Sequence, residues 1–304
     1  MKAWRPRVRR LLAVSLTCMA LMGLSLAQTA SVPDLHPLTL APNGLWWDPS
    51  EQQLYLTDDV GNRLVVWRDG ALTGRSLTLP PAPASGAGLG QLAREPGGRW
   101  WVTRFGFGKD GSVLTISPDG APLALSGLSP QRRRIAVQVV DAGRVLIGWF
   151  VKDIAGGVSL LTLGKDGQAT EADVVEGLVK PAGVVLAGDH LLVADQGTGR
   201  LLSFPWRPQT SGRPQDASAG RVVARWDPDA GIDLMVADSR GTLYIGARAG
   251  FLDAVSSTGE VRRLVSGLQP LRGVALDEAG RRLMVVELGR PTGHGPALRV
   301  LPLD

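Results

Sequence analysis

Cysteine and histidine are scarce in this sequence of 304 residues, which has one Cys and three His. The one cysteine, Cys18, lies in an N-terminal apolar run that we expect to be removed, so the mature chain is predicted to form no disulfide and no thiolate metal site. The sequence has no G-x-S-x-G motif, which argues against a serine-hydrolase nucleophile elbow. Beyond the N-terminal run, no ten-residue stretch shows a convincing helical period of about 3.6 residues, which argues against a helical fold.

A surplus of one charge sign is also missing once the N-terminus is set aside. The whole chain has 33 basic and 28 acidic side chains, but five of the basic ones lie in residues 1–27, which have no acidic residue: Lys2, Arg5, Arg7, Arg9 and Arg10. The remaining chain therefore has 28 of each sign. Without a basic stripe interleaved with aromatic residues, we expect no nucleic-acid partner.

The first 27 residues have the three parts of a secretory signal peptide. The basic head is followed by an apolar middle from Leu11 to Leu26, and Ser25-Leu26-Ala27 is a small-x-small cleavage site. The apolar middle is shorter than the about 20 residues that span a bilayer. We therefore expect cleavage without a retained membrane anchor, and export to the periplasm or the cell exterior.

Residues 42–70, PNGLWWDPSEQQLYLTDDVGNRLVVWRDG, are the template for the rest of the chain. Three short apolar runs alternate with turn residues, and a fourth run, Ser76–Leu79, completes the unit. The second run recurs in steps of 46, 45, 46, 52 and 40 residues, beginning at Leu54, Trp100, Val145, Leu191, Leu243 and Leu283. Four strands repeated every 40–50 residues or so predict an all-β, six-bladed β-propeller formed by residues 28–304 as a single domain. The Pro-, Ser- and Gly-rich segment 205–220 explains the longest step and is predicted to be a solvated loop.

The sixth unit has only three strands before the sequence ends at Asp304. The run His36–Leu40 is the candidate for its fourth strand, and we expect it to pair with Leu298–Leu301 and close the ring. Closure would remove two open sheet edges, which otherwise invite aggregation.

Propeller geometry places the entries to the first strands and the connections between second and third strands on one face, where we expect a small-molecule site. Counting back from the turn that ends each first strand gives the entry positions Asn43, Gly90, Ala136, Ala182, Asp233 and Arg272. The second strands end at Asp58, Arg104, Trp149, Asp195, Ala247 and Glu287, and the loops beyond add Phe105, Phe107, Phe150, Lys152, Gln196, Arg248, Arg290 and His294. The predicted binding residues are Arg104, Trp149, Arg248, Arg272 and His294.

Four side chains in this set could supply oxygen ligands to one divalent cation such as Ca²⁺: Asn43, Asp195, Asp233 and Glu287. The alternative is that each carboxylate pairs with a neighbouring arginine, of which Arg104, Arg248, Arg272 and Arg290 are available. His294 is the one histidine predicted on this face, so it is the candidate general base.

Units such as PNGLWWDPSEQQLYLTDDVGNRLVVW and PAGVVLAGDHLLVADQGTGRLLSF resemble the repeats of NHL-type propellers and of the gluconolactonase and senescence-marker (regucalcin-like) family, over essentially residues 35–304. The resemblance implies a divalent metal that polarises a lactone carbonyl and activates water. That family holds its metal with a Glu entering blade one, an Asn entering blade four and an Asp entering blade five. Here Asn43, Ala182 and Asp233 stand at those positions: Asp233 matches, Asn43 could bind through its carbonyl oxygen, and Ala182 cannot bind.

Three functions fit these observations. The first is metal-assisted hydrolysis of a lactone or similar ester, with Asp233 as the catalytic residue. The second is a non-catalytic binding or interaction module, which Ala182 and the arginines favour. The third is a quinone-dependent sugar dehydrogenase, in which His294, with Arg248, Arg272 and Lys152, would surround an acidic cofactor.

Overall fold

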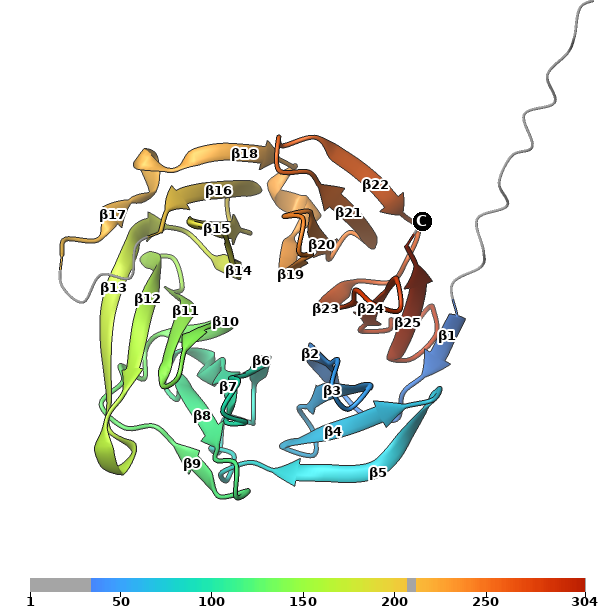
Figure 1. Ribbon diagram of the computed structural model, residues 1–304, viewed down its shortest axis with the longest axis horizontal. Coiled ribbons are helices and arrows are strands. Elements are labelled where there is room, and N and C mark those ends of the chain that lie inside the picture. The colour runs from blue at the N-terminus through green and yellow to red at the C-terminus, as the bar shows by residue number, and fades with distance from the viewer. Residues whose placement is uncertain (1–33, 207–211, 304) are drawn as a thin grey trace, which may run out of the picture. The chain divides into compact units, whose positions relative to one another are not determined.

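The structure, a computed structural model, describes residues 34–206 and 212–303. Its strands form six sheets around a central channel, so the predicted six-bladed, all-β propeller is confirmed (Figure 1). The predicted leader, residues 1–27, lies outside the described residues. Helical segments in the described part are single turns of three residues, and none could span a bilayer.

Each of the first three blades begins with its innermost strand and continues outward by antiparallel pairing. Blade 1 contains β2 (Pro42–Asp48), β3 (Gln53–Asp58), β4 (Arg63–Arg68) and β5 (Ala71–Thr78). Blade 2 contains β6 (Leu89–Arg94), β7 (Trp100–Arg104), β8 (Ser112–Ile116) and β9 (Pro122–Ala124). Blade 3 contains β10 (Arg133–Asp141), β11 (Arg144–Val151), β12 (Ala155–Leu163) and β13 (Ala169–Leu178).

The other three blades repeat this order around the channel. Blade 4 contains β14 (Pro181–Ala187), β15 (His190–Asp195), β16 (Arg200–Pro205) and β18 (Arg221–Arg225). Blade 5 contains β19 (Ile232–Ala237), β20 (Leu243–Ala247), β21 (Phe251–Val255) and β22 (Val261–Val265). Blade 6 contains β23 (Leu271–Asp277), β24 (Arg282–Glu287), β25 (Ala297–Pro302) and, at its outer edge, β1 (Asp34–Pro37).

The N-terminal strand closes the ring, as the sequence predicted. Strand β1 pairs antiparallel with β25, with His36 opposite Leu298, and begins two residues before the predicted run. The following residues contribute directly to the core, since Leu38 and Leu40 are buried with side chains of blades 1 and 6. The closure therefore joins the first and last blades by both hydrogen bonds and apolar packing.

The core consists of six hydrophobic clusters, each between two neighbouring blades. This follows from the sequence, because both faces of most second and third strands are apolar and become buried between adjacent sheets. The turns fit their residues too. Asp69 and Gly70 connect β4 to β5 with positive φ at both positions, as a two-residue type I′ turn requires.

The described residues 212–220 of the segment 205–220 contain a short strand and a helical turn that the predicted solvated loop did not include. Gln215 and Asp216 form β17, which pairs parallel with the outer strand β13 of blade 3. The Asp216 carboxylate then accepts a hydrogen bond from the Ser218 amide at 2.8 Å, which caps a helical turn whose Ala217 is buried. Composition alone pointed to a loop because the pairing partner of this short strand is about 40 residues away in sequence.

Candidate functional site

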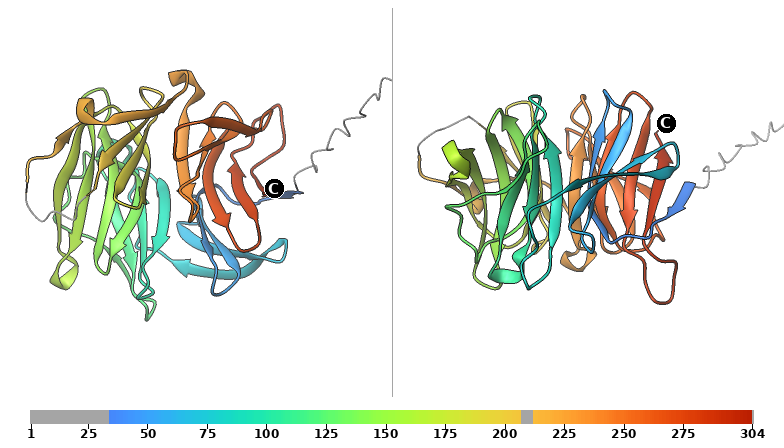
Figure 2. Two further views of the ribbon diagram at one scale, coloured as in Figure 1. Left: turned by 45° about the horizontal axis from the view of Figure 1, so that its top comes forward. Right: turned by 90° about the horizontal axis from the view of Figure 1, so that it is seen from below.

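The candidate site lies on the face at which the six inner strands begin, which we call the entry face; Figure 2 shows the propeller from the side, with loops gathered at its two faces. Every inner strand has a register irregularity there. In blade 1, Pro42 pairs with Asp58 and Leu45 with Leu56, so one extra residue is accommodated. Bulges of this kind re-aim side chains next to functional sites.

The strand register places six residues at equivalent positions around the channel: Asn43, Gly90, Ile135, Ala182, Asp233 and Arg272. The sequence count gave Ala136 for blade 3, which is one residue too late. The cause is a second irregularity in β10, between Val139 and Asp141, that adds a residue to this strand alone. The predicted ends of the second strands agree with the observed pairing.

The inner strands approach closely at these positions. The Asn43 side-chain amide donates to the Leu89 carbonyl at 2.6 Å, which links blade 1 to blade 2. A Cβ at Gly273 would lie 2.6 Å from the Asn43 carbonyl oxygen, so only glycine allows blade 6 to pack this close to blade 1. The Asn43 side-chain amide therefore has a structural role, since it joins blades 1 and 2.

Asp233 and Arg272, from neighbouring blades, form an ion pair at the channel mouth, with Arg272 Nη1 3.0 Å from Asp233 Oδ2. Asp233 is buried, whereas the Arg272 side chain is 27% exposed. Burial raises the pKa of the Asp233 carboxyl, and the charges of Arg272 and Lys180 only partly oppose this effect. The pair is thus a buried carboxylate that holds a partly exposed arginine side chain at the channel mouth.

Three further cations accompany this pair and, with Arg272, form what we call the cationic cluster: Arg133, Lys180, Arg248 and Arg272. Burial lowers the pKa of Lys180, Asp233 raises it, and the three arginines lower it further. Within the described residues, no carboxylate lies within ion-pair distance of Arg133, Lys180 or Arg248. Four cations therefore share the single buried carboxylate of Asp233.

The other predicted metal ligands are engaged elsewhere. Asp195 is buried and accepts hydrogen bonds from the Lys180 amide at 2.7 Å and the Thr198 hydroxyl at 2.7 Å. Glu287 is buried and bonds Arg299 and the Gln269 amide. Within residues 34–206 and 212–303, no three Asp, Glu, His or Cys side chains come together as a metal site. With Arg272 on Asp233, these donors do not fit a divalent cation.

Two predicted binding residues are engaged in contacts within the propeller. Arg104 donates to the Asn62 side chain at 2.9 Å and to the carbonyls of Pro80 and Pro81, and burial lowers the pKa of its guanidinium. Trp149 donates to Asp173 at 3.2 Å and lies beneath the Arg132 guanidinium. Neither residue is free to contact a ligand with its polar group.

The remaining predicted residues separate into two places on the entry face. His294 lies 3.3 Å from Glu287 through Nε2, and its Nδ1 contacts the Gly295 carbonyl, so both ring nitrogens are engaged. Arg248 and Arg290 instead line a cavity of about 580 Å³ with Gln196, Gly197, Pro228, Asp229, Gly231, Ala249 and Pro270. Arg248 thus belongs to both the cavity and the cationic cluster.

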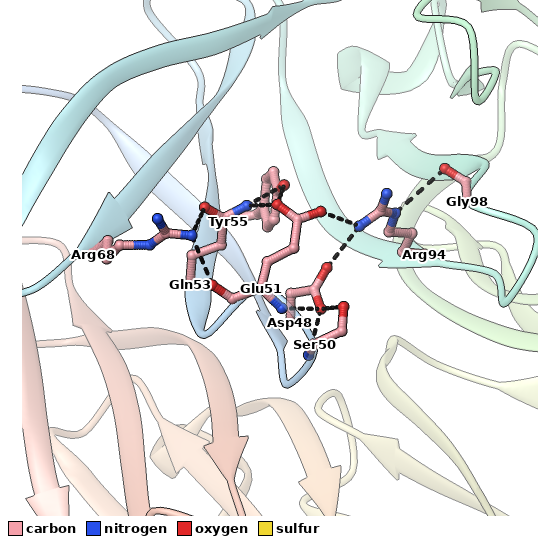
Figure 3. A network of polar contacts seen from close by, with 8 residues as sticks. All are labelled: Asp48, Ser50, Glu51, Gln53, Tyr55, Arg68, Arg94 and Gly98. Atoms are coloured by element: carbon pink, nitrogen blue, oxygen red, sulfur yellow. Dashed lines mark hydrogen bonds and ion pairs between the residues drawn. The ribbon is translucent and has the colours of Figure 1, made fainter.

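A separate polar network lies at the opposite end of blades 1 and 2 (Figure 3). Arg94 donates to Asp48 at 2.6 Å and to Glu51 at 3.1 Å, so it ties the two blades together. Burial raises the pKa of Asp48, but hydrogen bonds from Ser50, the Glu51 amide and Arg94 outweigh this effect and the pKa is lowered. The carboxylates of Asp48 and Glu51 both have partners within the network, whereas Arg68 Nε is buried without one, and we assign the network to stability.

Sequence reasoning missed Arg133 and Lys180. Each lies two residues before the residue that occupies the equivalent channel position, Ile135 in blade 3 and Ala182 in blade 4. The repeat alignment compared one entry position per blade, and both cations lie two residues before that position. Extending the comparison to those two preceding residues would have found them.

No protein-family model matches the chain, and no curated protein matches its sequence. Solved structures do match its fold. A gluconolactonase of Xanthomonas campestris is 20% identical at a TM-score of 0.65, with 90% of this chain and 91% of that chain covered. The calcium-binding protein regucalcin of Agrobacterium tumefaciens is 17% identical at a TM-score of 0.63, covering 87% and 93%. The PQQ-bound aldose sugar dehydrogenase of Streptomyces coelicolor is 15% identical at a TM-score of 0.63, covering 90% and 99%.

These neighbours confirm that the fold is that of the gluconolactonase- and regucalcin-like six-bladed propellers, as the repeat units predicted. At such low identities the likeness concerns the fold alone, because one fold hosts many chemistries. The function must therefore be argued from the residues on the entry face.

Proposed function

We propose that this protein is an exported, lactonase-like propeller that binds a small anionic molecule at the mouth of its central channel. The observation that supports the proposal most strongly is the cationic cluster, in which Arg133, Lys180 and Arg248 lack a carboxylate partner among the described residues. Grouping cations costs free energy that a bound carboxylate or phosphate would offset by charge-assisted hydrogen bonds.

The same residues would serve the hydrolysis of a lactone or ester, which is the second candidate. In acyl transfer the carbonyl oxygen becomes negatively charged, and cations fixed beside it stabilise that charge. The product of lactone hydrolysis is itself a carboxylate, which the cluster would bind. In this account Asp233 holds Arg272 in place, at 3.0 Å, and is a positioning residue. A metal ion has no role in it, because the donor set does not fit one.

A quinone-dependent dehydrogenase has less support. The cationic cluster would suit an acidic cofactor, and one structural neighbour is a PQQ-bound aldose sugar dehydrogenase. However, the predicted base His294 contacts Glu287, and Lys152 lies near Asp153, 3.8 Å away, with 68% of its side chain exposed. Neither residue adjoins the cluster through a contact in the structure.

Thermal unfolding of residues 28–304 tests the binding proposal. Phosphate, citrate and gluconate should raise the melting temperature, whereas glucose should not. Lys180→Met should reduce the shift, while Lys165→Met, the same change at an exposed lysine on the opposite face, should leave it intact. Equal shifts with glucose, or shifts that Lys180→Met does not alter, would contradict the proposal.

Lactone turnover is tested separately with glucono-δ-lactone and a γ-lactone, in chelator and in added Ca²⁺. We expect hydrolysis that chelator does not abolish and that Asp233→Asn lowers by about tenfold or more, because Arg272 loses its anchor. Turnover that depends strictly on Ca²⁺ would show that a metal acts here after all. Anion binding without any turnover would leave the binding module as the function.

A further inference from the structure

Three phenylalanines gather on the entry face of blades 2 and 3, beside the cationic cluster. The rings of Phe105 and Phe107 meet edge-to-face at 5.4 Å, and those of Phe105 and Phe150 are 5.7 Å apart. Phe150 is buried, but Phe107 is 49% exposed. Only five phenylalanines occur in the whole sequence, and three of them lie here.

The backbone at Phe107 has an unusual conformation for a bulky residue. Its φ of 52° and ψ of 21° are left-handed, a region that favours glycine, asparagine and aspartate. The residue lies in the single turn η1 (Gly106–Gly108), and both neighbours are glycines with positive φ. Strain of this kind persists where surrounding structure holds it, and it concentrates at binding sites.

Two contacts hold Phe107 in place. The Arg133 guanidinium donates from Nη2 to the Phe107 carbonyl at 3.1 Å. The ring lies over Gly88, where an added Cβ would come within 3.1 Å of Phe107 Cε2. Strain, a cation on the carbonyl and a glycine beneath the ring together keep this aromatic side chain at the surface, where Phe107 remains 49% exposed.

The cations lie over the other two rings. The Arg133 guanidinium is 5.1 Å from the Phe105 ring centre and 5.8 Å from that of Phe150, and Lys180 Nζ is 5.5 Å from the Phe150 ring. These are cation–π distances. Arg133 thus reaches both the Phe107 carbonyl and the Phe105 ring, while Lys180 lies over the neighbouring Phe150 ring. Neither cation has an ion-pair partner in the described chain.

We propose that the ligand of this site is an aromatic or otherwise planar unsaturated anion. Its ring packs against Phe107, and its carboxylate or phosphate meets Arg133 and Lys180. The inference rests on the proposed anion binding and adds the chemical class of the ligand. Aromatic pairs in edge-to-face or offset geometry favour an aromatic ring over a saturated one of similar size by about two- to tenfold.

Two probes of equal charge and similar shape test the preference: 2-naphthoate and decahydronaphthalene-2-carboxylate. Isothermal titration of residues 28–304 should show that the aromatic acid binds about two- to tenfold more tightly. The saturated acid is the more hydrophobic of the two, so simple apolar burial predicts the opposite order. Equal or reversed affinities would overturn the aromatic inference while leaving anion binding intact, and binding of neither acid would contradict the proposed function itself.

Two variants separate a binding role from a structural one. Phe107→Leu should bring the affinity ratio of the two acids close to one while retaining affinity for the saturated acid. Phe107→Asn should also bring the affinity ratio close to one. It should not lower the melting temperature, because asparagine adopts the left-handed backbone conformation with less strain than phenylalanine. If Phe107→Asn instead lowers the melting temperature and leaves the ratio unchanged, Phe107 is a packing residue and the inference fails.

Discussion

Asp233 shows how a single residue can match a known pattern and still serve another purpose. Its place at the start of the inner strand of blade 5 follows from the repeat, and the structure confirms that position. Its partner depends on what the next blade presents there, and blade 6 presents the cation Arg272. Both residues were predicted from the sequence as site residues. Their pairing depends on side-chain distances, which a repeat alignment does not contain.

We predict that Arg272→Met destabilises the protein at neutral pH by about 3 kcal/mol, because it leaves the buried Asp233 carboxylate without its partner. Burial already raises the pKa of Asp233, and losing Arg272 raises it further. A carboxyl with a raised folded-state pKa costs stability as pH rises above its unfolded value. The defect should therefore be large at pH 8 and shrink toward pH 4.

Urea unfolding of wild type and Arg272→Met across that pH range measures the effect. Arg281→Met, at an exposed arginine without a carboxylate partner among the described residues, is the matched control. A defect of constant size from pH 8 to pH 4 would show that Asp233 is not the group responsible.

At the scale of elements, the strands were predictable because each blade repeats the same apolar runs and turn residues. The second strands begin within one residue of their predicted starts. The irregularities were not predictable from composition. The extra residue in β10 shifted the alignment of blade 3, and β17 pairs with a strand of another blade. Both features depend on long-range pairing, to which local sequence patterns are insensitive.

Closure by the N-terminal segment makes a prediction at this scale. Leu40 is 8% exposed in the cluster between blades 1 and 6, so Leu40→Ala should lower stability by about 2–4 kcal/mol. Leu35, in β1 itself, is 38% exposed, and Leu35→Ala should cost well under about 1 kcal/mol. Denaturant midpoints of the two variants give the comparison. Similar losses of stability in the two variants would show that the segment contributes strand pairing and no apolar packing.

The network that joins blades 1 and 2 predicts a pH-dependent contribution. The lowered pKa of Asp48 means that its stabilisation is present above its unfolded pKa of about 3.9 and is lost as pH falls below it. Asp48→Asn should therefore destabilise the protein at pH 6 and have a smaller effect at pH 3. Chemical unfolding at the two pH values measures this; an effect that grows on acidification would exclude Asp48 as an ionised partner of Arg94.

At the scale of the whole molecule, the charge balance and the N-terminal residues lead us to propose that the protein is exported. Residues 1–27 carry the whole excess of basic side chains, and we propose that they are removed during export. Expression in a bacterial host should give a periplasmic or secreted protein whose N-terminal residue is Gln28, as read by intact mass. A chain that keeps Met1 and stays with the membrane fraction would contradict this proposal.

The sequence predicted the propeller fold, whereas it did not predict which side chains form the charged site. Each of the six similar units predicts one blade, so an error in one unit does not change the predicted fold. The site occurs only once and does not repeat with the blades. Its side chains come from blades 2 to 6 and lie close together only in the closed ring. Nothing in the sequence distinguishes Arg133 and Lys180 from other cations, and they join Arg248 and Arg272 only in the closed ring.

The most direct measurement of the central claim is a titration calorimetry comparison of cyclohexanecarboxylate with cyclohexylmethanol, performed on residues 28–304 at low and high salt. The account predicts that the acid binds, that its affinity falls as salt rises because exposed cations are screened, and that the alcohol binds at least tenfold more weakly. Equal affinity for acid and alcohol, unaffected by salt, would show that the cationic cluster does not select the ligand.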